Sequence, residues 1–226
     1  TNLKFLITIL GTWILCPIIA GVIAMGLFTF TKRVILNRKL HILRLDAYTR
    51  TALLLAGAFG AYSLGANNIA NVMGVFVPIS PFTDVTIGNL FVFSSKEQLF
   101  LLGGLAIAVG VFTYSKRVMF TVGNDLLKMT PVAAFIVVIS HSIVLFLFAY
   151  QGISAFLQSI NLPSIPLVPV SSSQAVVGGV IGIGLLKGGK EVQWSIAGRI
   201  SLGWMTLPII AALISLIVLF ILENIF

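Results

Sequence analysis

Long apolar runs separated by short polar segments dominate the chain and predict a bundle of membrane-spanning helices. A helix needs about 20 consecutive apolar residues to cross a bilayer. The runs that meet or approach this length cover residues 5–30, 47–77, 99–114, 131–150, 170–186 and 200–222. The run at 47–77 is too long for one simple span, and glycines and asparagines interrupt it. We therefore expect a helix there, followed by a broken or re-entrant piece.

Positive charge between the runs alternates along the chain and predicts its orientation. Segments 32–50, 116–128 and 187–199 hold six, three and three Lys or Arg residues, whereas 79–98 holds one and 151–168 holds none. Since cytoplasmic loops are enriched in Lys and Arg, the three basic segments are expected in the cytoplasm. The loops alternate between the two sides of the membrane only if the short apolar run before the last span counts as one crossing. Both chain ends are then predicted to lie outside.

The composition is that of an integral membrane protein. Of 226 residues, 58% are hydrophobic and only 9% are charged, whereas a soluble domain carries about 25% charge. The net charge of +8 lies mostly in short loops, so it indicates topology and not a nucleic-acid partner. A single cysteine, Cys16, excludes an internal disulfide. The chain lacks H-E-x-x-H, G-x-S-x-G and P-loop motifs, so no enzymatic activity is predicted.

An internal repeat predicts how the chain is organised. "WILCPIIAG" starts at Trp13 and "WMTLPIIAA" starts at Trp204, and both read W-x-x-x-P-I-I-A. Chance likeness of two proline-containing apolar helices is the alternative. If the repeat is genuine, residues 1–31 form the last transmembrane helix of a preceding repeat. Residues 32–46 are then a basic cytoplasmic linker with a helix lying in the membrane interface, and 47–226 form a C-terminal transmembrane repeat.

The first polar place in the apolar sequence is "SLGANNIANVMG", which contains Asn67, Asn68 and Asn71. An unpaired polar group in hydrocarbon costs several kcal/mol, so these amides need protein, water or a ligand as partner. In a helix, Ser63, Asn67 and Asn71 lie four residues apart on one face. Amides offer oxygens to a small cation and N–H groups to an anion, and the flanking glycines would allow the helix to break. Interhelical hydrogen bonding is the structural alternative.

The second polar place is Ser171-Ser172-Ser173-Gln174, which follows a proline-rich loop and precedes an apolar run. This order predicts a helix N-terminus, where free N–H groups and the helix dipole attract anions. An ordinary N-cap is the alternative, but one serine would suffice for it. His141, between two serines of the span at 131–150, indicates either a proton relay or, preferably, a buried and hydrogen-bonded imidazole.

At these two places the sequence resembles the inorganic phosphate transporter (PiT) family. Family members carry G-A-N-D-V-A-N in each half and P-V-S-T-T-H later in each half. Residues 65–71 read G-A-N-N-I-A-N and residues 169–174 read P-V-S-S-S-Q. A "TPVAAF" segment at Thr130 falls where the family has a T-P segment, and the two W-x-x-x-P helices match the ends of the family's halves. The likeness covers the C-terminal half of the family plus one preceding helix.

The sequence departs from the family at its titratable positions. Asn68 stands where the family has Asp, and Gln174 stands where it has His. Ala133 and Val138 fall roughly where the family often has Arg and Glu. This half is therefore poorly equipped to relay a proton, although it can still solvate ions and hydrogen-bond phosphate. Formal charge, if any, is expected from the N-terminal half.

The resemblance implies an all-α polytopic protein of the plasma (inner) membrane, built as one repeat of an inverted-repeat secondary transporter with broken or re-entrant helices. The implied activity is cation-coupled symport of inorganic phosphate, with sodium favoured because amides and hydroxyls are oxygen donors that do not titrate usefully. The expected partners are phosphate, the sodium ion, the N-terminal half and the lipid bilayer; a homodimer stays open. No cofactor is expected besides co-transported sodium. A sulfate permease of the same family, an anion or water pore, and a structural membrane subunit are the alternatives.

The site residues follow from the two motifs. The phosphate-binding residues expected are Ser171, Ser172, Ser173, Gln174 and Asn68. The cation-binding residues expected are Asn67, Asn68, Asn71 and Ser171, with sodium itself at Asn67 and Asn71.

Overall fold

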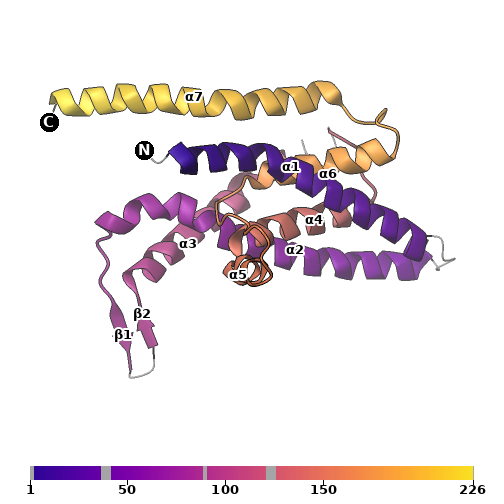
Figure 1. Ribbon diagram of the computed structural model, residues 1–226, viewed down its shortest axis with the longest axis horizontal. Helices are drawn as coiled ribbons and strands as arrows, with labels where there is room; N and C mark the ends of the chain where they lie inside the picture. Colours follow the sequence, from indigo (N-terminus) through magenta and orange to yellow (C-terminus); the bar gives the residue numbers. More distant parts are fainter. Residues whose placement is uncertain (1–2, 37–41, 89–90, 121–125, 226) are drawn as a thin grey trace.

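The computed structural model describes residues 3–36, 42–88, 91–120 and 126–225, and these residues are mostly helical (Figure 1). The α-helices are α1 (Leu3–Thr31), α2 (Ile42–Met73), α3 (Ser95–Phe120), α4 (Pro131–Ala149), α5 (Gln151–Ser159), α6 (Ser172–Leu186) and α7 (Trp194–Ile225). A π-helix, Lys32–Leu36, follows α1, and a 3-10 helix, Gly74–Ile79, follows α2. Strands β1 (Val85–Ile87) and β2 (Phe91–Phe93) pair antiparallel between α2 and α3.

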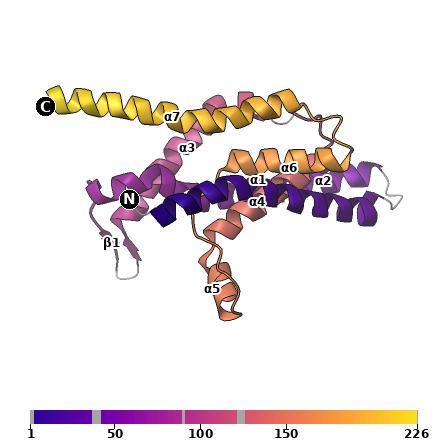
Figure 2. The ribbon, with the colours of Figure 1, turned by 45° about the horizontal axis from the view of Figure 1, so that its top comes forward.

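The predicted multi-pass helical architecture is confirmed. Within the described residues, four helical stretches are long and apolar enough to cross a membrane: Ile7–Val34, Ser95–Lys116, Pro131–Ala149 and Trp194–Ile225. Helix α6 is apolar but has only 15 residues, as expected for a half-helix. The β-hairpin and α5 were not predicted, because both lie in segments that read as loops. Figure 2 shows α5 projecting away from the packed helices.

Helix α2 differs from the expectation of a break near the asparagines. It runs without interruption from Ile42 through the whole cluster to Met73, and the α-helical geometry changes only at Gly74. A helical glycine costs only about 1 kcal/mol relative to alanine, and packing against a neighbour offsets that cost. The expected change of helix geometry therefore falls at Gly74, the second glycine that flanks the cluster, and not among the asparagines.

The predicted interfacial linker at 32–46 is described only in part. Residues 32–36 continue α1 as the π-helix, and α2 already begins at Ile42. Residues 37–41 lie outside the described part of the chain. The described portion therefore belongs to the ends of the flanking helices.

Two helix pairs, α1 with α6 and α2 with α4, form the packed centre, and α4 also contacts α1 and α6. Glycines set the distance between α1 and α6. A Cβ atom added at Gly178 would collide with the backbone of Pro17, and one at Gly182 would lie 2.5 Å from the Gly21 carbonyl oxygen. Small residues allow membrane helices to approach until their backbones touch. The glycine run in α6 thus serves packing.

A buried amide joins the two polar motifs. Asn67 is 5% exposed, and its Oδ1 accepts the Val170 N–H at 2.9 Å. Its Nδ2 donates to the Leu145 carbonyl oxygen at 3.4 Å. Val170 lies in the extended segment before α6, where its N–H has no helical partner. The Asn67 side chain therefore holds α2, α4 and the entry to α6 together.

The end of α1, the start of α2, the start of α4 and the end of α6 meet at one end of the helix bundle. Phe28 near the end of α1, Leu45 near the start of α2, Thr130 before α4 and Lys187 after α6 line one cavity. The Gln193 N–H also donates to the Leu126 carbonyl oxygen at 3.1 Å. The first turn of α1 and the last turn of α7 lie at the opposite end (Figure 1). The side of the membrane on which each end lies stays a prediction.

Helix α7 lies apart from the other helices and is almost uncovered. Ala197 is its only buried residue among those described, and only its first turns pack on the core, through Ile196, Ile200 and Trp204. The remaining turns extend away from the packed helices in Figure 1, and their large apolar side chains are exposed. In a membrane these turns can face lipid or further protein.

The glycine contact between α1 and α6 yields a stability prediction. Gly178→Ala should lower the Tm of the full-length protein in detergent by about 5 °C or more, because the new methyl group meets backbone that cannot move aside. Gly26→Ala is the matched control, since nothing lies within 4 Å of its added Cβ atom. Equal Tm values for the two variants would contradict the packing role.

The Asn67 bridge yields a second prediction. Asn67→Ala should destabilise the protein by about 1–3 kcal/mol, because it leaves the buried Val170 N–H without an acceptor. Asn71→Ala, one helical turn away at an exposed position, should leave the Tm unchanged. Thermal unfolding of both full-length variants measures the difference. If Asn71→Ala lowered the Tm more than Asn67→Ala, the hydrogen bond between Asn67 and Val170 would not be what holds the two motifs together.

Candidate functional site

Helix α6 begins at the second polar motif, as predicted, and Ser171 forms the N-cap that was the structural alternative. The Ser171 hydroxyl accepts the Gln174 N–H at 3.4 Å, and the Ser171 and Ser173 hydroxyls lie 3.0 Å apart in a hydrogen bond. Within the described residues, the N–H groups of Ser172 and Ser173 donate to no acceptor. Two free amide donors and a group of hydroxyls thus meet at the positive end of the helix dipole.

A cleft of about 730 Å³ brings this helix end to the asparagine motif. Asn68 and Asn71 line it from α2, and Ser172 lines it from the first turn of α6. The facing wall comes from α3 and is apolar, with Phe100, Ile107 and Val111 among its residues. Phosphate-sized ligands fit such a volume, and the polar groups that could orient them stand on one side only.

The face expected to carry Ser63, Asn67 and Asn71 together is divided in the structure. Ser63 and Asn67 are buried, and the Ser63 hydroxyl donates to the Phe59 carbonyl oxygen at 2.8 Å. Asn71 is exposed and joins Asn68, three residues earlier, at the cleft. One turn beyond Asn67 the neighbour of α2 is α3 instead of α4, so the environment of the face changes along the helix.

Gln174 combines burial with an unsatisfied acceptor. Its side chain is 6% exposed, and its Oε1 has no hydrogen-bond partner. A buried acceptor without a donor costs about 1–3 kcal/mol. A bound cation or a ligand O–H group at the first turn of α6 would satisfy this oxygen.

The other polar residues of the span at 131–150 serve α4 itself. Ser140 and Ser142 are fully buried, and their hydroxyls donate to the carbonyl oxygens of Val137 at 3.0 Å and Val138 at 2.6 Å. His141 between them is half-buried and does not line the asparagine cleft.

The site as described is chemically neutral. Among the described residues, no three His, Cys, Asp or Glu side chains come together. The cleft therefore offers amide oxygens, hydroxyls and N–H groups, which suit a small cation and an anion together. The α3 wall had no signal in the sequence, because its residues read as an ordinary apolar span.

Two curated relatives resemble the chain over most of its length. A protein of Methanocaldococcus jannaschii assigned as a phosphate permease is 29% identical over 218 residues, which cover 96% of this chain and 61% of that protein. Sodium-dependent phosphate transporter 1 of Homo sapiens is 28% identical over 161 residues, covering 69% of this chain and 21% of that protein. The chain thus spans about three fifths of the archaeal relative and about one fifth of the human one.

A solved structure titled "The sodium-dependent phosphate transporter" has the same fold. Its superposition covers 100% of this chain and 68% of that chain, with a TM-score of 0.71 at 20% identity. The sequence profile described as "Phosphate transporter family" matches residues 43–215, which include both polar motifs and most of the chain. This chain therefore belongs to the phosphate transporter family, whose members are transporters and not enzymes.

Proposed function

We propose that this chain forms one half of a symporter that carries inorganic phosphate across the membrane with sodium. The observation that supports it most is the hydrogen bond from Val170 to Asn67, because it holds the two motifs where Asn68, Asn71 and Ser172 line one cleft. A human relative and a solved structure, both named as sodium-dependent phosphate transporters, also support it.

Phosphate binds at the first turn of α6 in this proposal. The free N–H groups of Ser172 and Ser173 and the serine hydroxyls, including that of Ser171, donate to phosphate oxygens. The Asn68 amide donates from α2, on the same side of the cleft. Gln174 Oε1, which lacks a donor, accepts the hydroxyl group that monohydrogen phosphate carries.

The cation binds beside phosphate through amide oxygens. Asn68 and Asn71 bring carbonyl oxygens to the cleft. The Ser171 hydroxyl belongs to the residue just before Ser172, which lines the cleft from α6. Asn67 can contribute only the second lone pair of its Oδ1, because Val170 already uses the first. A co-bound sodium ion offsets the cost of bringing the phosphate charge into the membrane.

The rest of the site comes from outside this chain. The cleft is lined by polar groups on one side only, and a second, inverted repeat on its open side would complete it. That repeat supplies formal charge, and the transporter lies in the plasma membrane with the basic segments in the cytoplasm and both ends of this chain outside.

The phosphate site predicts weaker transport when a polar side chain of the cleft is removed from either α2 or α6. Asn68→Ala and Ser172→Ala should each raise the KM for phosphate uptake by about tenfold or more, because hydrogen bonds to a charged group contribute about 1.5–3 kcal/mol. Radiolabelled phosphate uptake by full-length protein in proteoliposomes measures this. Asn224→Ala and Ser159→Ala are matched controls at exposed positions outside the cleft. Unchanged uptake by both cleft variants would overturn the proposal.

The neutral cleft predicts sodium coupling. Replacing external sodium by potassium should abolish most phosphate uptake, whereas an uncoupler that collapses the proton gradient at a fixed sodium gradient should leave it intact. Excess sulfate should not compete with phosphate. Uptake driven by a proton gradient without sodium would contradict the coupling, and strong competition by sulfate would make sulfate the substrate.

A further inference from the structure

A separate basic cavity lies at the end of α1, far from the asparagine cleft. It has a volume of about 310 Å³ and is lined by Phe28, Thr29, Lys32, Arg33 and Leu186. Lys32 and Arg33 are exposed, and neither forms an ion pair within the described part of the chain. No acidic residue lines the cavity. Two uncompensated positive charges therefore stand at the mouth of an otherwise apolar hollow.

An apolar groove between α1 and α6 lies one helical turn before this cavity along α1. It has a volume of about 320 Å³, and its walls include Ile18, Val22 and Met25 of α1 and Ile181 and Leu185 of α6. The α1 residues are spaced by four and three, so they form one stripe that continues to Thr29 and Lys32. Ile18 and Val22 are 55% and 57% exposed, so the groove opens outward.

The groove and the basic cavity together have about the length of one membrane leaflet. At a rise of 1.5 Å per residue, the stripe from Ile18 to Thr29 is about 16 Å long. Half of a hydrocarbon core of about 30 Å is about 15 Å. The headgroup of a lipid in the groove would thus lie beside Lys32 and Arg33. Its acyl chain would end near Gly21, where α1 packs against the glycines of α6.

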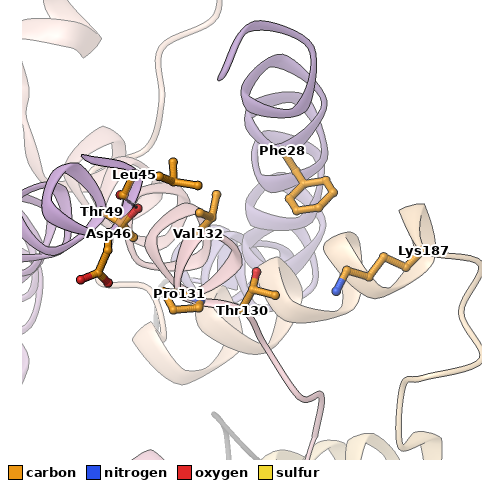
Figure 3. Close-up of a pocket in the computed structure, with 8 residues that line it drawn as sticks. All are labelled: Phe28, Leu45, Asp46, Thr49, Thr130, Pro131, Val132 and Lys187. Atoms are coloured by element: carbon orange, nitrogen blue, oxygen red, sulfur yellow. Dashed lines mark hydrogen bonds between the residues drawn. The ribbon is translucent and has the colours of Figure 1, made fainter. Parts of the chain in front are cut away.

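A neighbouring cavity adds a third positive charge. It has a volume of about 510 Å³ and shares Phe28 with the basic cavity. Figure 3 shows the Lys187 ammonium group directed toward this cavity, whereas the Asp46 carboxylate points away from it. Asp46 is bound by Arg50 at 2.9 Å, while Lys187 is held only loosely by Glu191 at 3.9 Å.

We propose that this groove and its basic mouth bind one anionic phospholipid, with the headgroup phosphate at Lys32 and Arg33 and an acyl chain between α1 and α6. Basic pockets between helices at a membrane surface recognise anionic headgroups, and each nearby Lys or Arg strengthens the attraction. Charge complementarity selects such a lipid over a zwitterionic lipid or an apolar protein segment, neither of which would need the cationic pair.

Lipid binding can be measured by native mass spectrometry of the full-length protein, titrated with phosphatidylglycerol or phosphatidylcholine. Wild type should retain one phosphatidylglycerol molecule that Lys32→Gln/Arg33→Gln binds about tenfold more weakly or worse. Lys116→Gln/Arg199→Gln, two exposed cations outside the groove, should behave as wild type. Val22→Trp should also expel the lipid by filling the groove, whereas Val218→Trp on α7 should not.

The other outcomes would each overturn the proposal. Equal retention of phosphatidylcholine would show general hydrophobic contact, and absence of retained lipid from wild type would show that protein covers the groove. Displacement of the bound molecule by inorganic phosphate alone would show a free-phosphate site. If the Lys32→Gln/Arg33→Gln variant retained phosphatidylglycerol, the headgroup would not bind at these two cations. If Val22→Trp retained it, the acyl chain would not lie in the groove.

Discussion

The hydrogen bond between the Val170 N–H and the Asn67 amide oxygen is the interaction on which the polar centre of this molecule depends. The chain leaves extended backbone before α6 and starts this apolar helix at Ser172. Backbone groups of such a segment have no helical partner, and hydrocarbon offers none. Asn67 supplies the missing acceptor and, through Leu145, anchors it to α4. The free helix end at Ser172 is thereby fixed against α2.

This constraint separates structural amides from accessible ones within one short motif. Asn67 is committed to the protein, whereas Asn68 and Asn71 remain available in the cleft. Gln174 is buried like Asn67, but its side-chain oxygen accepts no hydrogen bond. The first turn of α6 therefore contains an unpaired hydrogen-bond acceptor next to the N-cap. In the function that we propose, this cleft binds charge with neutral groups, and further protein completes its open side.

Helix α1 links the two sites that we propose. Its central part packs on the glycines of α6 closely enough that backbone meets backbone, which keeps α6 and its N-terminus in position. Its outer stripe and its basic end face away from that contact. A phospholipid held there would stiffen the same helix pair that presents Ser172 to the cleft. Lipid occupancy and transport would then be coupled through α1 and α6.

The sequence by itself determined the apolar spans and the helix start that Ser171 caps, because span length and capping are local properties. The pairing of the two polar motifs followed from the likeness to the phosphate transporter family. The sequence did not determine the uninterrupted course of α2, since the small cost of glycine is decided by packing on α4. Nor could spacing tell Asn67 from Asn71, because both lie on one helical face and differ only in their neighbours. The α3 wall and the groove beside α1 likewise exist only once helices distant in sequence pack together.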